Sequence, residues 1–164
     1  MIDAGRHSDQ LDAWSALVGV YQSVLHDVVR ALEDDAGLDS GVFSALAYLA
    51  RAEPAGRLRL GELQELMHPR YSQPGLSRLV QRMEADGLVE RRPDPDDGRA
   101  GILVLTPAGK SRFGRADAVY TEALREHFGR HLSAAQARSL TAALAPVAGG
   151  RTIRGAGSRT VRSG

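Results

Sequence analysis

The stretch that decides the fold is SQPGLSRLVQRMEADGLVERRPDPDDGRAGILVL, residues 72–105. Its first part predicts a helix that Ser72 caps, with Pro74 in the first turn, where the missing amide proton of proline costs no hydrogen bond. Gly87 is a natural end for this helix, and its inner face consists of Leu76, Leu79, Val80 and Met83. The second part predicts a β-hairpin, because the β-prone segments 88–92 and 101–105 flank residues that favour turns.

Three shorter elements are expected upstream of this stretch. Residues 62–68 have the pattern of a two-turn helix that Pro69 ends, with an inner face of Leu63, Leu66 and Met67. Residues 57–60 alternate between polar and apolar, which predicts a small strand or an extended entry. An earlier helix, capped by Asp39 or Ser40 and closed by Pro54 and Gly56, has an inner face of Phe43, Leu46 and Leu49.

Longer helices are expected before and after these elements. The first has apolar residues at alternating steps of three and four until Gly37 ends it: Leu11, Trp14, Val18, Tyr21, Leu25, Val28 and Leu32. This stripe can pack within the domain or against a second subunit, and the pattern allows both. Thr106 and Pro107 start a fifth helix that runs to about residue 128. Ser133 and Gln136 form the capping box of a sixth helix, whose apolar residues are Leu140, Leu144 and Val147.

The composition limits the class of protein. The 164 residues, 43% hydrophobic and 25% charged, suit one globular domain. The absence of cysteine excludes disulfides, thiolate zinc sites and cysteine nucleophiles. No catalytic motif or phosphate-binding glycine loop is present, so we expect neither an enzyme nor a cofactor or metal. No apolar run suits a membrane helix and the N-terminus lacks the apolar core of a signal peptide, so the sequence predicts a soluble, cytoplasmic protein.

The charge is unevenly distributed along the chain. Residues 1–54 hold three Arg against nine Asp or Glu, whereas residues 55–112 hold ten basic and eight acidic side chains. Residues 149–164 hold four Arg, no acid and few apolar residues, which predicts a basic, disordered tail. Contact with an anionic partner is therefore expected in the middle of the chain.

The order of short helix, turn, second helix and β-hairpin predicts a winged helix-turn-helix within residues 40–105. In this arrangement the second helix enters the major groove of DNA while the hairpin reaches the backbone or the minor groove. The predicted reading face of the second helix consists of Ser72, Gln73, Gly75, Ser77, Arg78 and Arg82. The alternative interpretation of this polar face alone is an ordinary solvated helix surface.

The hairpin carries its own candidates for DNA contact. Arg91 and Arg92 lie in its first strand, and Asp97 and Arg99 lie two residues apart in its turn. A carboxylate at that spacing can brace the guanidinium, and an arginine suits the negative potential of a narrow minor groove. A solvated turn pair worth less than about 1 kcal/mol is the alternative, but the neighbouring arginines favour DNA contact.

Residues 60–109 resemble the multiple-antibiotic-resistance-regulator (MarR) family. The resemblance lies in GEL at 61–63, SRLVQRMEADGLVERRPDPDDGR at 77–99 and LTPAGK at 105–110. The order of six helices with a wing extends it over residues 10–148. It implies a mainly α fold in which a winged helix-turn-helix with a small β-hairpin is flanked by dimerisation helices, residues 10–35 and 107–148. The implied dimer contacts include Leu11, Trp14, Val18, Tyr21, Leu140 and Leu144.

The resemblance also implies a function. The expected protein is a homodimeric transcriptional regulator, a repressor, that binds a pseudo-palindromic site in double-stranded DNA. A small anionic or aromatic effector would bind where the dimerisation helices meet the winged unit. Two departures concern the contacts with DNA: Gly98 stands where the family often has arginine, and Pro74 and Gly75 begin the reading helix. An effector-independent architectural DNA-binding protein and a winged-helix module for protein contacts remain the alternatives.

Two patterns that contain histidine are candidate ligand sites. His127 and His131 have the i, i+4 spacing of zinc ligands on a helix, but no third ligand is near in sequence, which favours an ordinary polar helix end. His26 and Tyr48 could line a small-molecule cavity, although half-buried core positions are the commoner role of such residues. Neither pair is predicted to bind a ligand.

Overall fold

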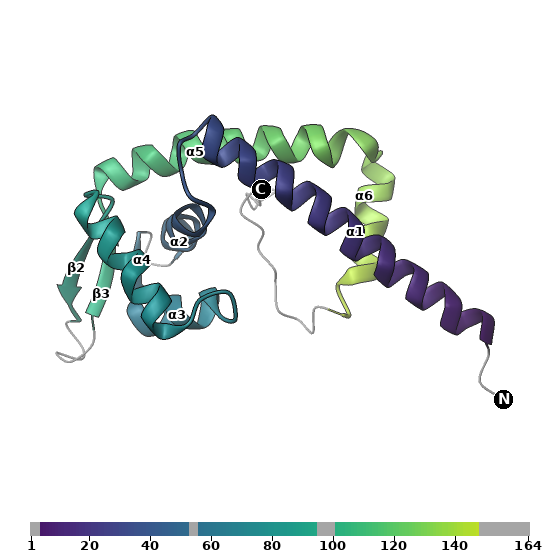
Figure 1. Ribbon diagram of the computed structural model, residues 1–164, viewed down its shortest axis with the longest axis horizontal. Coiled ribbons are helices and arrows are strands. Elements are labelled where there is room, and N and C mark those ends of the chain that lie inside the picture. Colours follow the sequence, from purple (N-terminus) through teal and green to yellow (C-terminus); the bar gives the residue numbers. More distant parts are fainter. Residues whose placement is uncertain (1–3, 53–55, 95–100, 148–164) are drawn as a thin grey trace, which may run out of the picture.

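The computed structural model describes residues 4–52, 56–94 and 101–147, with side chains from residue 8 onward. Its elements follow the order α1 (Ala4–Asp34), α2 (Ser40–Arg51), β1 (Arg57–Arg59), α3 (Leu60–Met67), α4 (Gln73–Ala85), β2 (Val89–Pro93), β3 (Gly101–Leu105), α5 (Pro107–His127), a 3₁₀ turn η1 (Gly129–His131) and α6 (Ala134–Leu144). The predicted mainly helical fold with a small hairpin is confirmed (Figure 1). The predicted residues Asp97, Gly98 and Arg99 and the basic tail lie outside the described residues.

The strands form one antiparallel sheet in the order β1-β3-β2. The hairpin of β2 and β3 runs in the register Val89 opposite Leu105 and Arg92 opposite Ile102. Strand β1 pairs with the other side of β3, with Arg59 opposite Ile102. The short strand expected from residues 57–60 is therefore real, and it widens the hairpin into a three-stranded wing.

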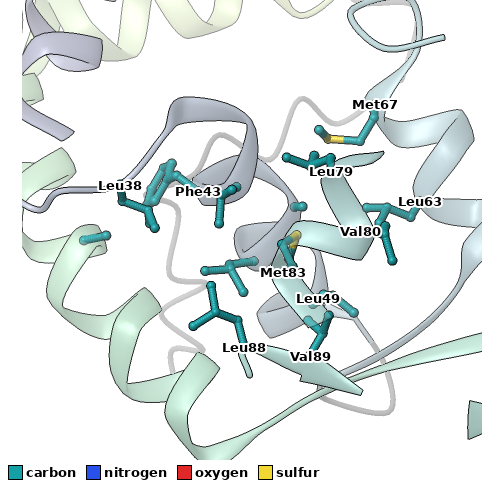
Figure 2. Close-up of a cluster of buried hydrophobic side chains, with 14 of the residues drawn as sticks. Leu38, Phe43, Leu49, Leu63, Met67, Leu79, Val80, Met83, Leu88 and Val89 are labelled. Atoms are coloured by element: carbon teal, nitrogen blue, oxygen red, sulfur yellow. The ribbon is translucent and has the colours of Figure 1, made fainter. Parts of the chain in front are cut away.

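The core lies between the C-terminal part of α1, α2, α3, α4, the inner face of the sheet and the inner side of α5. Figure 2 shows side chains from α2, α3, α4 and β2 converging there: Phe43, Leu49, Leu63, Met67, Leu79, Val80, Met83 and Val89. The predicted inner face of α4 is buried as expected. Burial of these apolar residues leaves the opposite, polar face of α4 exposed to solvent.

The helix ends follow the predicted local signals. Asp39 caps α2 and Ser72 caps α4, and Ser133 forms the predicted capping box with Gln136. The helices α1 and α4 end just before Gly37 and Gly87, which have φ angles of 57° and 68°. Only glycine adopts this left-handed conformation without steric cost.

Helices α1 and α5 pack against each other and support the winged unit. The N-terminal half of α1 projects away from that unit, toward the end of the molecule that carries α6 (Figure 1). Within the described ranges, no helix has the length and apolar character that crossing a membrane requires.

Three details of the sequence interpretation are wrong. Leu66 was expected to point inward but is 46% exposed, because Leu63 and Met67, four residues apart, already define the buried stripe of this short helix. Val147 lies beyond the end of α6 and is 80% exposed. His127 ends α5 while His131 lies in η1, so the two histidines do not share one helix face.

Candidate nucleic-acid interface

The outward face of α4 presents polar side chains beside the wing. The hydroxyl of Ser72 accepts a hydrogen bond from the backbone N–H of Gly75 over 3.3 Å, which starts the helix. Gln73, Ser77 and Arg78 are exposed, as predicted for a reading face. Gly75 is only half exposed, because Tyr71 and Ser72 lie against it. The exposed part of this face is therefore narrower than the sequence pattern suggested.

Arg78 has an exposed side chain that makes no hydrogen bond or ion pair with any residue that the structure describes. Its guanidinium is thus available to an external acceptor without loss of an internal contact. Arginine forms two parallel hydrogen bonds with guanine O6 and N7 or with a phosphate. This makes Arg78 the strongest candidate for nucleic-acid contact on α4.

Arg82, one turn further along α4, is held within the protein. Its Nη2 donates to Oδ1 of Asp39 at 3.0 Å, and both side chains are about half exposed. The predicted reading face thus contains Arg78, which has no partner among the described residues, and Arg82, whose carboxylate partner lies 43 residues away. The sequence pattern treated the two alike.

The two arginines of strand β2 also have acidic neighbours. Arg91 Nε lies 3.6 Å from Oε1 of Glu84 on α4. Arg92 donates to Oε2 of Glu90 from Nη2 at 2.7 Å and from Nε at 3.2 Å. The Arg92 pair is solvent-exposed and the Arg91 pair is partly exposed, so a phosphate can replace the carboxylate in either pair. The two cations face solvent at the side of the hairpin, where the prediction put them.

A partly buried ion pair holds the end of the wing that leads into its turn. Arg59 Nε donates to Oδ2 of Asp94 at 2.6 Å, and the Asp94 side chain is fully buried. The backbone N–H of Arg59 donates to Oε2 of Glu62 at 2.8 Å in the first turn of α3. Arg59 therefore connects the sheet, the first helix of the helix-turn-helix and the start of the wing turn. Sequence reasoning missed this pair, since its members lie 35 residues apart.

A groove of about 850 Å³ runs between α3, the start of α4 and Gly101 of the wing. Its α4 side includes Gln73 and Ser77, and its α3 side includes Glu62 and Glu65. The Nε2 of Gln64 donates to the carbonyl of Tyr71 at 3.0 Å and so holds the turn between α3 and α4. The groove therefore lies beside the start of the reading helix, between the helix-turn-helix and the wing.

A second hollow, a cleft of about 430 Å³, lies between the winged unit and the long helices. It is lined by aromatic and cationic side chains of α1, α2, α5 and the turn after α3: Tyr21, Tyr48, Tyr120, Arg51 and Arg70. The ring of Phe43 stacks on that of Tyr120 with centroids 4.9 Å apart. Of the two residues weighed for a cavity, Tyr48 lines this cleft, whereas His26 is exposed and does not.

Large apolar side chains are exposed on the projecting half of α1. Trp14 is 62% exposed, and Leu11 and Tyr21 are exposed to a similar degree. Leu140 of α6 is also exposed, while Val18 and Leu144 are half-buried. All six residues are those predicted for a dimer interface. Exposed apolar patches of this kind commonly mark a surface that a partner covers.

A short helix, a turn and a second helix, followed by a hairpin in a three-stranded antiparallel sheet, define a winged helix-turn-helix protein. Residues 36–100 match the model of the MarR family. Together with the solved structures described next, this match supports a winged helix-turn-helix transcriptional regulator of the MarR family, as the motifs at 60–109 predicted. The family and the relatives described next are regulators rather than enzymes.

Solved structures support this assignment. AbsC, a MarR family transcriptional regulator from Streptomyces coelicolor, is 27% identical, with a TM-score of 0.74 over 85% of this chain and 92% of that chain. Sco3205, a MarR family transcriptional regulator from the same organism, was solved in complex with DNA. It is 27% identical, with a TM-score of 0.74 over 87% of this chain and 90% of that chain. A MarR family regulator from Silicibacter pomeroyi is 26% identical over 90% and 99% of the two chains, with a TM-score of 0.70. A comparison with curated protein sequences gives no match.

Proposed function

We propose that this chain is a sequence-specific DNA-binding regulator that represses transcription as a homodimer on a pseudo-palindromic site. The observation that carries the proposal is the exposed face of α4, where Arg78 has no partner among the described residues, beside a wing that presents Arg91 and Arg92. The similar structure of Sco3205, which was solved in complex with DNA, also supports the proposal. Such a regulator acts in the compartment that holds the DNA, in agreement with the expected cytoplasmic location.

The proposed contacts divide by position. Ser72, Gln73, Ser77 and Arg78 reach base edges and phosphates in the major groove, with Gly75 allowing close approach of the helix start. Arg91 and Arg92 reach the sugar-phosphate backbone beside the wing. The resemblance adds Arg99 in the minor groove with Asp97 bracing it. Arg82 differs from these residues because Asp39 already holds its guanidinium.

The homodimer is proposed from the exposed apolar residues of α1 and α6. Residues 10–35 and 107–148 form the dimerising part, and residues 40–105 form the DNA-binding part. A second copy covers Trp14 and its neighbours, whose exposure in one copy leaves apolar area in water. Two-fold symmetry then sets the two α4 helices about 34 Å apart, one turn of DNA.

We also propose that a small effector relieves the repression. The cleft between the winged unit and the long helices offers three tyrosine rings and the cations Arg51 and Arg70, which suit an anionic or aromatic molecule. An occupant releases DNA only if it binds more tightly to the dimer geometry that fits DNA poorly. Operator DNA must then weaken effector binding by the same factor.

The experiment that tests the proposal is selection of bound sequences from a random DNA pool, followed by footprinting on the recovered sequence. A regulator of this kind protects one discrete palindrome. An architectural protein protects DNA broadly, and a protein-contact module shows no salt-dependent DNA affinity. Either of these last two results contradicts the proposed function.

A further inference from the structure

The linker between α1 and α2, residues 35–39, is held from two sides. The carbonyl of Gly37 accepts a hydrogen bond from Nη2 of Arg112 on α5 over 2.6 Å. Two residues further on, the side chain of Asp39 accepts from Arg82 of α4. The linker therefore touches both the long-helix part of the molecule and the helix that is proposed to read DNA.

Asp39 is a fixed partner for Arg82. Its Oδ1 accepts hydrogen bonds from the backbone N–H groups of Gly41 at 3.0 Å and Val42 at 3.1 Å, which cap α2. The same oxygen accepts from Arg82 Nη2 at 3.0 Å. Because the capping contacts fix the rotamer of Asp39, and the positive end of the α2 dipole favours its charge, the carboxylate stays in place to hold the guanidinium.

A second contact holds the start of α4, at the opposite end of that helix from Arg82, against α2. The ring of Tyr71, just before α4, lies against both Gly41 and Gly75: a Cβ at position 41 would lie 2.8 Å from Tyr71 Cζ, and one at position 75 would lie 3.6 Å from Tyr71 Cδ1. Arg82 lies nine residues after the first residue of α4, about 14 Å along the helix axis. These two contacts are separated along α4 and both meet the start of α2, so together they restrict the direction of α4 relative to α2.

We propose that Asp39 and Arg82 form an orienting pair that sets the direction of α4, so that Arg82 serves DNA binding through Asp39 rather than through a phosphate. The proposal rests on the DNA-binding function proposed above and assigns Arg82 a positioning role within it. Arg78, on the same helix, is the contrasting case: it has no partner among the described residues and is available for DNA. A phosphate at Arg82 would first have to displace a carboxylate that the α2 cap holds in place.

The test measures the DNA affinity of Asp39→Asn, Arg82→Gln and the double variant, with the wild-type full chain as reference. The DNA is the sequence that the wild type selects from a random pool. Asparagine caps helices as well as aspartate does, so Asp39→Asn removes the charge and keeps the cap. We expect each single variant to bind about two- to five-fold more weakly, the range of a partly exposed ion pair. We expect the double variant to bind no more weakly than either single variant, and Arg82→Gln to leave the salt dependence of binding unchanged.

A matched control separates this effect from the change in net charge. Asp34→Asn alters the charge by the same amount and removes a surface pair with Arg30, 3.7 Å apart on α1. Loss of a negative charge by itself favours DNA binding through the general field of the protein. The control should therefore bind DNA as well as the wild type or slightly better, opposite in direction to Asp39→Asn.

A phosphate contact by Arg82 gives the opposite pattern. Asp39→Asn would then release the guanidinium of Arg82, and the affinity for DNA would stay equal or increase. Arg82→Gln would lower the salt slope of DNA binding by about one unit. Arg82→Gln would also still weaken DNA binding in the Asp39→Asn background. Any of these results overturns the proposal.

Measurements without DNA separate this proposal from the proposed function. Urea unfolding of the same four proteins reports whether the two substitutions are coupled, and hydrogen exchange reports the stability of α4. Additive effects on unfolding with unchanged exchange in α4 overturn the orienting pair even if DNA binds. If the wild-type chain retains no DNA in the selection, the proposed function is overturned. The DNA role of Arg82 is then overturned as well, even if unfolding shows that Asp39 and Arg82 are coupled.

Discussion

The carbonyl oxygen of Leu88 lies where a side chain at Gly109 would begin. A Cβ placed on Gly109 would contact that oxygen far inside van der Waals distance and would lie 3.0 Å from the carbonyl carbon of Leu88. The hydroxyl of Thr106 completes the junction: it donates to the carbonyl of Gly87 at 2.7 Å and accepts from the N–H of Gly109 at 2.9 Å. The first turn of α5 is thus joined to the start of β2, which explains glycine in the LTPAG motif.

Gly109→Ala should therefore destabilise the protein. The obstacle is backbone, which cannot rotate aside, so we expect a loss of about 1–3 kcal/mol or more in the free energy of unfolding. Gly114→Ala is the matched control on the same helix, because a Cβ there meets nothing within 4 Å. It should be neutral or gain up to about 1 kcal/mol of helix propensity. Urea unfolding measures both, and equal stability of the two variants contradicts the prediction.

Arg78→Ala should weaken binding to the selected DNA by about 1–3 kcal/mol and relax the preference at one position in each half-site. Arg125→Ala, which removes an exposed cation paired with Glu122 on α5, is the control for net charge. Fluorescence anisotropy on matched and mismatched sites measures the effect. Equal affinity of Arg78→Ala and the wild type, with both folded, would falsify the assignment of Arg78.

Trp14→Glu should produce a monomer, because it puts a charge where a second copy is proposed to cover an indole that is 62% exposed in one copy. A central interface tryptophan commonly contributes about 2 kcal/mol or more to association. Trp14→Phe keeps an aromatic ring and should remain dimeric. Light scattering at micromolar concentration distinguishes the two, and a monomeric wild type would contradict the proposed assembly.

Tyr120 should make the protein less stable in alkali. Burial raises the pKa of Tyr120 above its usual value of 10.0, and Asp117 acts in the same direction while Arg51 opposes it. Because the folded state keeps the phenolic proton longer than the unfolded chain, this stabilisation is complete below about pH 10 and is lost as the pH rises through the folded-state pKa. Tyr120→Phe should flatten this decline in urea unfolding measured at increasing alkaline pH. Parallel declines in the two proteins would exclude Tyr120 as the cause.

Local sequence signals predicted the helix ends and the reading helix. Asp39, Ser72, Thr106 and Ser133 each cap the helix that follows, and the buried face of α4 is the one that its spacing indicated. These features depend on contacts within three or four residues, so the sequence alone contains the information for them. The same local reasoning misplaced Leu66, because in an eight-residue helix two adjacent stripes fit the pattern and only the packing of α3 selects one.

By itself the sequence determined the order of elements and the winged helix-turn-helix, since periodicity, caps and turn residues act over short distances, and its motifs at 60–109 gave the resemblance to the MarR family. Only the tertiary structure decided which cations have partners. Arg82 meets Asp39 and Arg59 meets Asp94 across 43 and 35 residues, and β1 completes the wing by pairing with β3. The physical reason is that an ion pair or a strand pairing forms wherever packing brings two groups together. Identical arginines on one predicted helix face therefore receive different roles only after the chain has folded.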